Sequence, residues 1–206
     1  VQGETGVGKE VIARAIHSES QRRKGPLRSI NCGAIPATLI ESVLFGHEKG
    51  AFTGAERTSP GIFEQASGGT VMLDEVGELS PAAQAALLRV LETKRVMRVG
   101  GVQEVEVDVR VLAATHRDLE QMADAGTFRR DLLYRLNALT LRVPPLRERR
   151  EEIDALADLF LEEASRANGT PALGLDARAR ELLRGYAWPG NVRELRNVIE
   201  RAVLVA

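Results

Sequence analysis

The chain has 206 residues, of which 44% are hydrophobic and 28% are charged, a balance typical of a globular domain. Its formal net charge of −1 excludes a global electrostatic attraction to nucleic acid or to an acidic membrane. The single cysteine, Cys32, excludes an internal disulfide, and no apolar run approaches the roughly 18 residues that a membrane span needs. We therefore expect a cytoplasmic protein without a membrane anchor.

A glycine-rich segment opens the chain and fits the pattern G-x-x-x-x-G-K: Gly3-Glu4-Thr5-Gly6-Val7-Gly8-Lys9. Glycines permit backbone angles that turn consecutive N–H groups toward phosphate oxygens, and the helix that follows adds the positive end of its dipole. Lys9 supplies a positive charge for the outer phosphates. A plain strand-to-helix turn is the alternative interpretation of this spacing. Glu10 stands where the general pattern has Ser or Thr for magnesium, so a bound metal needs other carboxylates.

The next elements follow from apolar spacing and from helix-start signals. A helix is predicted up to His17, a short strand over Leu27–Asn31, and a second helix that begins at Pro36. The segment Phe45–Ala55 contains three glycines and two phenylalanines without a helical or strand period, so we predict a loop. Its composition leaves two interpretations open, because the phenylalanines either tuck back into the core or form exposed tips that bind a partner.

A short apolar run, Gly69–Glu75, ends in two acidic residues. It predicts a buried parallel strand that carries Asp74 and Glu75 to its carboxyl end, where ligands bind in open α/β sheets. Behind a phosphate-binding loop, ATP hydrolysis needs an aspartate for magnesium and a glutamate that polarises water. A solvated pair of loop acids is the alternative.

A helix and a strand are predicted next along the chain. Ser80-Pro81 combines a capping residue with a proline at the first helical position, which predicts a helix start. Valines alternate with charged residues over Val105–Val111 and predict one strand. The strand leads to His116, a residue type that in isolation is more often structural than catalytic.

The last part of the α/β region is followed by a helical one. Phe128–Asn137 carries three arginines in a helical stretch, a pattern equally typical of a solvated face, and Ala138–Val143 is predicted as the final strand. Pro144-Pro145 ends that strand. The sequence thus predicts an α/β nucleotide-binding subdomain over residues 1–143 and an all-helical lid subdomain over residues 144–206.

The final helix carries a local conflict. Trp188-Pro189-Gly190-Asn191 opens it, and Asn191 with Glu194 fits the capping-box pattern. Arg193 then falls in the first turn, where a cation meets the positive end of the helix dipole at a cost of about 0.3–1 kcal/mol. Such conflicts tend to mark functional positions.

Taken together, these motifs resemble the AAA+ ATPase domain of sigma-54-dependent transcription activators, the bacterial enhancer-binding proteins. The deciding motif matches the hallmark loop of that family letter for letter: Gly50-Ala51-Phe52-Thr53-Gly54-Ala55. The resemblance covers essentially the whole chain, and that family commonly has glutamate at the position of Glu10. It implies a P-loop AAA+ fold, in which a three-layer αβα domain around a parallel sheet precedes a small all-α lid.

The resemblance also assigns roles to the acidic and polar residues at the strand ends. The segment Gly3–Glu10 corresponds to the Walker A motif that binds ATP. Asp74 corresponds to the Mg²⁺ ligand and Glu75 to the residue that activates water. Asn31 matches an asparagine that holds the catalytic glutamate in check, and Thr115 occupies the sensor I position.

Three arginines resemble residues that contact nucleotide. Arg129 and Arg135 resemble arginine fingers that reach the nucleotide of a neighbouring subunit, and Arg193 resembles the sensor II arginine. The family often has an asparagine at the position of His116 and an acid at that of Arg130, so the resemblance assigns neither residue a role.

The function implied is ATP-driven remodelling by a ring, most commonly a hexamer, whose partner is the sigma-54 RNA polymerase holoenzyme. Phe52 is the expected main contact, with Thr53 as its support. DNA binding is expected only from a further C-terminal domain. Two other functions compete with this one: a different AAA+ motor of the unfoldase or helicase type, and a nucleotide-binding switch without turnover.

Overall fold

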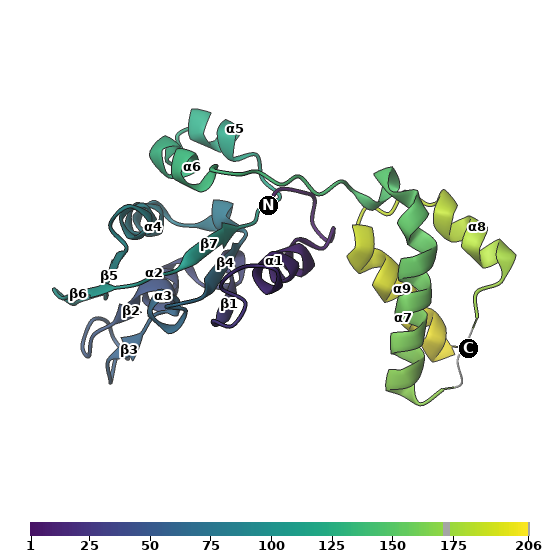
Figure 1. The fold of residues 1–206 in the computed structure, drawn as a ribbon, viewed down its shortest axis with the longest axis horizontal. Helices are drawn as coiled ribbons and strands as arrows, with labels where there is room; N and C mark the ends of the chain where they lie inside the picture. Colours follow the sequence, from purple (N-terminus) through teal and green to yellow (C-terminus); the bar gives the residue numbers. More distant parts are fainter. Residues whose placement is uncertain (171–173, 206) are drawn as a thin grey trace. The chain divides into compact units, whose positions relative to one another are not determined.

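A computed structural model describes residues 1–170 and 174–205 (Figure 1). Its contacts divide the chain into two compact units: residues 1–2 with 10–141, and residues 3–9 with 142–206. The glycine-rich segment Gly3–Lys9 therefore groups with the helical second unit. The subdomain boundary predicted between residues 143 and 144 stays a prediction.

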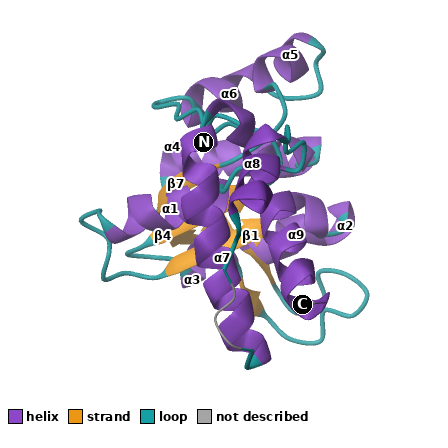
Figure 2. Ribbon diagram, turned by 90° about the vertical axis from the view of Figure 1, so that its right-hand side faces the viewer, coloured by secondary structure: helices purple, strands orange, loops and turns teal. Residues whose placement is uncertain are grey.

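The first unit is built on a parallel sheet with the strand order β1-β4-β7 (orange in Figure 2). Its strands are β1 (Leu27–Asn31), β4 (Thr70–Asp74) and β7 (Arg110–Ala113). The central strand β4 is buried on both faces, which explains its continuous apolar sequence. Asn31 of β1 lies opposite Asp74 of β4, so both strands end in a polar residue at the same edge of the sheet. The strands predicted at Leu27–Asn31 and within Gly69–Glu75 are confirmed.

Helices cover both faces of this sheet and make the three layers that the resemblance implied. They are α1 (Lys9–Ser18), α2 (Ala37–Phe45), α3 (Ile62–Gln65), α4 (Pro81–Thr93), α5 (Leu119–Asp124) and α6 (Arg130–Leu136). Met72 of β4 packs with Ala13 of α1 on one face. Its neighbours Val71 and Leu73 point the other way, into a larger core with α2, α3, α4 and α6. The predicted fold class is confirmed.

Two short antiparallel pairs extend from the unit, and one corrects a prediction. The pairs are β2 (Gly46–His47) with β3 (Ser59–Pro60), and β5 (Arg95–Met97) with β6 (Glu104–Glu106). The single strand predicted over Val105–Val111 is wrong, because the chain leaves β6 and joins the main sheet as β7. Val107 and Val109 lie between β6 and β7, and both are buried in the core of the first unit. Alternation of apolar and polar residues indicates which side chains are buried, but it does not indicate with which strand the segment pairs.

The strand predicted over Ala138–Val143 is also wrong. The structure describes all of these residues and assigns them no strand, although Leu141 accepts a backbone hydrogen bond from Gln2 at 2.8 Å. Gln2 bridges to Thr115 in parallel instead, beside the end of β7. Leu139 and Leu141 of this segment are exposed while Val143 is buried, so apolar composition alone misled the prediction.

The second unit consists mainly of helices around their own apolar core. They are α7 (Ile153–Asn168), α8 (Ala177–Gly185) and α9 (Asn191–Val205). Ile153 and Phe160 of α7 pack with Leu195 and Ile199 of α9, as the apolar spacing predicts. Among the described residues, no helix has the length and apolarity that crossing a membrane requires.

Candidate functional sites

The glycine-rich segment Gly3–Lys9 turns through left-handed backbone angles at two glycines. Gly6 has φ of 81° and Gly8 has φ of 99°, a region that residues with a side chain rarely adopt. Gly6 also lacks room, since a Cβ placed on it would lie 2.4 Å from the carbonyl oxygen of Gly190. A Cβ on Gly8 would meet nothing within 4 Å. Backbone angle and space thus both require glycine at position 6.

The carbonyl oxygens of residues 3–7 all accept hydrogen bonds from the same unit. The bonds run from Lys9 Nζ to Gly3 (2.9 Å) and Glu4 (3.2 Å), from Asn191 Nδ2 to Thr5 (3.1 Å), from Arg193 N to Gly6 (3.2 Å), and from Arg149 Nη2 to Val7 (2.7 Å). In a planar trans peptide the C=O and N–H groups point in opposite directions. Fixing the carbonyls therefore also fixes the directions of the N–H groups, which a phosphate cradle requires.

The side chain of Glu4 adds an ionic link. Its carboxylate accepts two hydrogen bonds from Arg147, at 2.6 and 2.9 Å, and one from Asn191 Nδ2 at 3.0 Å. The Arg147 guanidinium, followed by the Asn191 amide, lowers the pKa of Glu4 from 4.5 to about 2. Glu4 thus remains ionised at neutral pH and ties the glycine-rich segment to the start of the lid.

The capping box predicted for Asn191 is wrong. The Asn191 side chain does not cap α9, because its Nδ2 donates to Glu4 and Thr5 while its Oδ1 accepts from Leu146 N at 2.8 Å. Glu194 instead reaches back to accept the Gly190 N–H at 2.8 Å. The pattern correctly located the helix start, but the asparagine serves the loop rather than the helix.

The two acidic residues of the first unit lie at the carboxyl end of β4. Asp74 is its last residue, and its Oδ1 accepts the Glu75 N–H at 3.1 Å. Glu75 has φ of 54°, a left-handed angle that costs a residue with a side chain about 1–2 kcal/mol. Strain of this kind tends to accumulate at functional sites.

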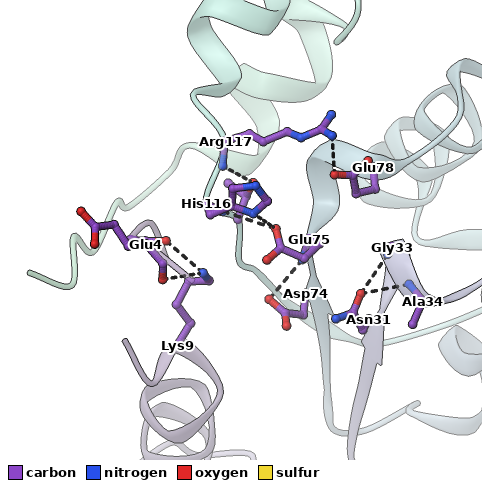
Figure 3. A network of polar contacts seen from close by, with 12 residues as sticks. Glu4, Lys9, Asn31, Gly33, Ala34, Asp74, Glu75, Glu78, His116 and Arg117 are labelled. Atoms are coloured by element: carbon purple, nitrogen blue, oxygen red, sulfur yellow. Dashed lines mark hydrogen bonds and ion pairs between the residues drawn. The ribbon is translucent and has the colours of Figure 1, made fainter. Parts of the chain in front are cut away.

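The nearest partner of Glu75 is His116, which the sequence had left without a role. His116 Nδ1 lies 2.6 Å from Glu75 Oε2, and the His116 backbone N–H donates to the same oxygen at 3.4 Å (Figure 3). Thr115, the residue before it, is buried, and its hydroxyl accepts the Arg117 N–H at 3.0 Å. The position of His116 at a strand end was the one signal in the sequence that favoured such a contact.

Asn31 lies at the same sheet edge but is engaged differently. Its Oδ1 accepts the N–H groups of Gly33 and Ala34, at 2.9 and 3.2 Å, and caps a short 3₁₀ turn (Figure 3). Within residues 1–170 and 174–205 no hydrogen bond joins Asn31 to Glu75. The role that the resemblance assigned to Asn31 therefore stays a prediction.

Carboxylates available to a metal are few. No group of three or more His, Cys, Asp or Glu residues in the described part of the chain forms a metal site by itself. Glu10 is exposed and pairs with Arg14 at 2.6 Å. Mg²⁺ usually binds through one or two carboxylates together with water and substrate phosphates, so Asp74 suits a metal that arrives with a nucleotide.

Arg129 precedes α6 and is held at its backbone. Its N–H donates to Oε1 of the buried Gln84 at 2.9 Å, and Gln84 Nε2 donates to Leu79 O and Thr127 O. The guanidinium is exposed and pairs with Asp131 at 2.7 Å, which raises the pKa of Arg129. The sequence contained no signal for Gln84, because its burial is decided by tertiary packing.

The remaining arginines occupy separate places. Arg135 lies in the last turn of α6 and donates from Nη2 to Leu91 O at 3.1 Å. Arg130 pairs with Asp124 on the surface at 2.5 Å. Arg193 lies in the first turn of α9. Its backbone N–H donates to Gly6 O, and its side chain is exposed.

The loop Gly50–Ala55 closes on itself. Gly50 N donates to Ala55 O at 2.8 Å and Ala55 N donates to Phe52 O at 3.0 Å, with left-handed angles at Gly50 (φ 83°) and Gly54 (φ 99°). The Phe52 ring meets the His47 ring edge-on with centroids 5.1 Å apart, and 37% of the residue stays exposed. Phe52 is therefore not a core residue.

The residues that flank this loop, here called its stem, are held by hydrogen bonds and ion pairs. Glu48 accepts from the Thr58 hydroxyl at 2.7 Å and from Arg98 Nη1 at 3.0 Å, and these two donors lower the pKa of Glu48. Arg98 also pairs with Glu64 at 2.7 Å. Glu48 N donates further to Val99 O at 3.0 Å. The stem is thus fixed, while the tip carries an exposed aromatic ring.

Residues 1–142 match the family model of the sigma-54 interaction domain, and residues 147–206 match that of the AAA+ ATPase lid domain. The chain belongs to the sigma-54 interaction domain family. With its lid it is an AAA+ ATPase domain, as the Walker A pattern and the Gly50–Ala55 loop had indicated.

Relatives of the domain support this placement. It is 54% identical to the regulatory protein AtoC of Escherichia coli (strain K12), over 100% of this chain and 44% of AtoC. It is also 54% identical to the nitrogen fixation protein AnfA of Azotobacter vinelandii, over 100% of this chain and 39% of AnfA. The chain thus spans less than half the length of these relatives.

The structure of NtrX from Brucella abortus is similar throughout. It superposes with a TM-score of 0.93 at 38% identity, over 99% of this chain and 46% of NtrX. NtrX has also been solved in complex with ADP and with ATP, and each complex matches with a TM-score of 0.92 at 38% identity over 99% of this chain and 44% of NtrX.

Proposed function

We propose that this domain hydrolyses ATP with Mg²⁺ and uses the Gly50–Ala55 loop to act on the sigma-54 RNA polymerase holoenzyme, converting closed promoter complexes to open ones. The observation that carries the proposal is that loop, which has a fixed stem and an exposed Phe52 in a sigma-54 interaction domain. The partner implies a cytoplasmic location, and DNA binding is assigned to a further C-terminal domain.

ATP binding is assigned to the segment Gly3–Glu10. The N–H groups of this segment and Lys9 would bind the phosphates, and the complexes of NtrX with ATP and ADP support this assignment. Asp74 would hold the magnesium ion, which when bound neutralises phosphate charge. Glu75 would take a proton from the attacking water as a carboxylate base.

The arginines of the α6 region are assigned to a neighbouring subunit's nucleotide in a hexameric ring. Arg129 supports this role because its guanidinium is exposed while its backbone is anchored by Gln84. A phosphate would replace Asp131 as its partner. Arg135 would act beside it, and Arg193 would respond to the γ-phosphate within its own subunit.

The polar residues near Glu75 complete the assignment. Thr115 is proposed as sensor I, and Asn31 as the residue that restrains Glu75 in one nucleotide state. In the structure Glu75 contacts His116 rather than Asn31, so Glu75 would have to change partner before Asn31 engages it. Thr53 would support Phe52 when the loop meets sigma-54.

A binding experiment tests the partner. Tagged domain is mixed with purified sigma-54 and a transition-state analogue of ATP, and captured sigma-54 is measured. We expect capture with the analogue and little without nucleotide. No capture under either condition would overturn the activator function and favour an AAA+ motor of another kind.

Phosphate release tests turnover. Glu75→Gln removes the base while keeping the size and a polar end of the side chain, so release should fall about 100-fold or more, with ATP binding retained. If the unaltered protein releases phosphate no faster than Glu75→Gln, the domain is a nucleotide-binding switch without turnover.

A further inference from the structure

We propose that Arg149 and Asn191 are positioning residues that hold the glycine-rich segment Gly3–Lys9 in its phosphate-binding conformation by binding its carbonyl oxygens. The inference rests on the proposed ATP site and adds two residues of the helical unit to it. Neither residue belongs to the Walker A motif.

Arg149 is the stronger of the two cases. Its side chain is 16% exposed and donates from Nη2 to Val7 O at 2.7 Å and from Nη1 to Glu152 Oε2 at 3.0 Å. Within the described residues its Nε is buried without a hydrogen-bond partner. Burying a guanidinium this deeply is unfavourable unless its bonds are strong, and a charged donor on a carbonyl is among the stronger hydrogen bonds. The contact with Val7 therefore offsets much of the cost of this position.

Asn191 is fully buried and uses both ends of its amide. Nδ2 donates to Thr5 O at 3.1 Å and to Glu4 Oε2 at 3.0 Å, while Oδ1 accepts from Leu146 N at 2.8 Å. Its backbone has φ of 53°, a left-handed angle that asparagine tolerates better than most residues. One side chain thus joins the loop to the first turn of the helical unit.

Asn191 and Arg149 bind two carbonyls of one turn that are separated by a single peptide. Val7 O and Thr5 O are fixed by side chains, and Gly6 O between them is fixed by the Arg193 backbone. If one carbonyl loses its donor, its peptide plane can rotate, and the N–H group of that peptide turns with it. Phosphate binding then has to pay the cost of ordering the loop again.

A loop defect of this kind has a recognisable signature. The N–H groups of a P-loop cradle the α- and β-phosphates, which ATP and ADP share. Loss of Arg149 should therefore weaken both nucleotides by the same factor. Loss of a γ-phosphate contact, the role proposed for Arg193, should weaken ATP more than ADP.

The experiment measures Kd for ATP and for ADP by titration of the full-length protein with fluorescent analogues. Arg149→Met keeps the apolar stem and removes the donors, and we expect both Kd values to rise about tenfold, equivalent to about 1.4 kcal/mol. Arg149→Lys keeps one charged donor and should restore most of the affinity. Asn191→Asp keeps the acceptor for Leu146 and removes both donors, so it should also weaken both nucleotides equally.

The matched control is Arg166→Ala, which removes an exposed arginine of the same unit that pairs only with Glu162, at 2.5 Å, among the described residues. It should leave both Kd values unchanged. Unchanged affinity in Arg149→Met, with the fold intact by circular dichroism, would overturn the inference. A loss confined to ATP would also overturn it, since it would indicate direct contact with the γ-phosphate. If the unaltered protein binds neither nucleotide, it is the proposed ATP site that fails.

Discussion

Two glycine-rich loops of this chain share their backbone angles but differ in what holds them. Gly6 and Gly8 in one loop, and Gly50 and Gly54 in the other, all have φ between 81° and 99°. The carbonyls of the first loop are bound by Lys9 and by residues far along the chain. The bonds of the second loop are made largely within itself and its stem.

The space around Gly6 shows the same difference, although Gly8 is as open as the two glycines of the second loop. A Cβ on Gly6 would collide with the Gly190 backbone, whereas a Cβ on Gly50 or Gly54 would meet nothing within 4 Å. Glycine content therefore does not indicate mobility. The first loop is built to hold one conformation for a small anion, and the second presents an aromatic tip on a firm base, which suits a loop that must engage a protein.

Gly6→Ala is expected to have the largest effect of the changes that test this contrast. The new Cβ would lie 2.4 Å from Gly190 O, and the backbone angle would be strained by about 1–2 kcal/mol in addition. ATP affinity should fall at least about 100-fold, or the glycine-rich segment should separate from the turn at Gly190. Nucleotide titration and thermal unfolding measure these two outcomes.

Gly54→Ala is the matched control, because its angle is equally left-handed but its surroundings are open. ATP affinity should stay unchanged, and only the binding of sigma-54 should be weakened. Equal losses of ATP affinity in both variants would show that backbone angle, rather than the packing at Gly190, distinguishes the loops.

Phe52→Leu sharpens the contrast from the other loop. Leucine retains an apolar tip but loses the ring and its edge contact with His47. Sigma-54 capture should fall about tenfold or more, as at an aromatic hot spot, while phosphate release is retained. Equal loss of both activities would refute separate roles for the two loops.

Much of the fold could be predicted because its signals are local. Ser80 caps α4 through a hydrogen bond from Ala83 N at 3.1 Å, with Pro81 at the first helical position as the sequence indicates. The apolar run at β4 likewise predicted a buried strand from its own residues. Short elements such as α3 (Ile62–Gln65) were not predicted, because four residues are too few to show a period.

The contacts of the sites were less predictable than their positions. The Walker A spacing located the loop, yet Arg149 is one of three arginines in four residues and nothing local distinguishes it from Arg147 or Arg150. Asn191 satisfied the capping pattern but is used elsewhere. Long-range polar contacts depend on which surfaces packing brings together, and periodicity does not encode that.

Thr58→Val tests the stem of the second loop with a smaller effect. The hydroxyl donates to Glu48 at 2.7 Å and accepts the Lys49 N–H at 3.2 Å, and valine keeps the shape but removes both bonds. Because the site is exposed, sigma-54 affinity should fall only about two- to fivefold, with ATP affinity unchanged. An unchanged sigma-54 affinity would mean that Arg98 and the backbone bonds suffice to fix the stem.

The smallest effect concerns pH and the first loop. The pKa of Glu4 is lowered from 4.5 to about 2 by Arg147 and then by Asn191, so the ionised form is favoured in the folded state. The stabilisation from Glu4 is therefore complete above pH 4.5 and is lost as the pH falls from 4.5 toward 2. Solvent screening at this partly exposed pair limits it to about 1 kcal/mol or less.

Thermal unfolding of the wild-type protein and Glu4→Gln at several pH values measures this contribution. Wild type should unfold at a slightly higher temperature at pH 7, and the difference should shrink below pH 4.5 because protonated Glu4 and glutamine bind Arg147 about equally weakly. Glu48→Gln is the parallel test in the second loop, since Arg98 keeps Glu64 as a partner at 2.7 Å when Glu48 is neutral. If the two variants lose stability with the same pH profile, ionic anchoring does not distinguish the loops, and the difference rests on the carbonyl bonds of residues 3–7 alone.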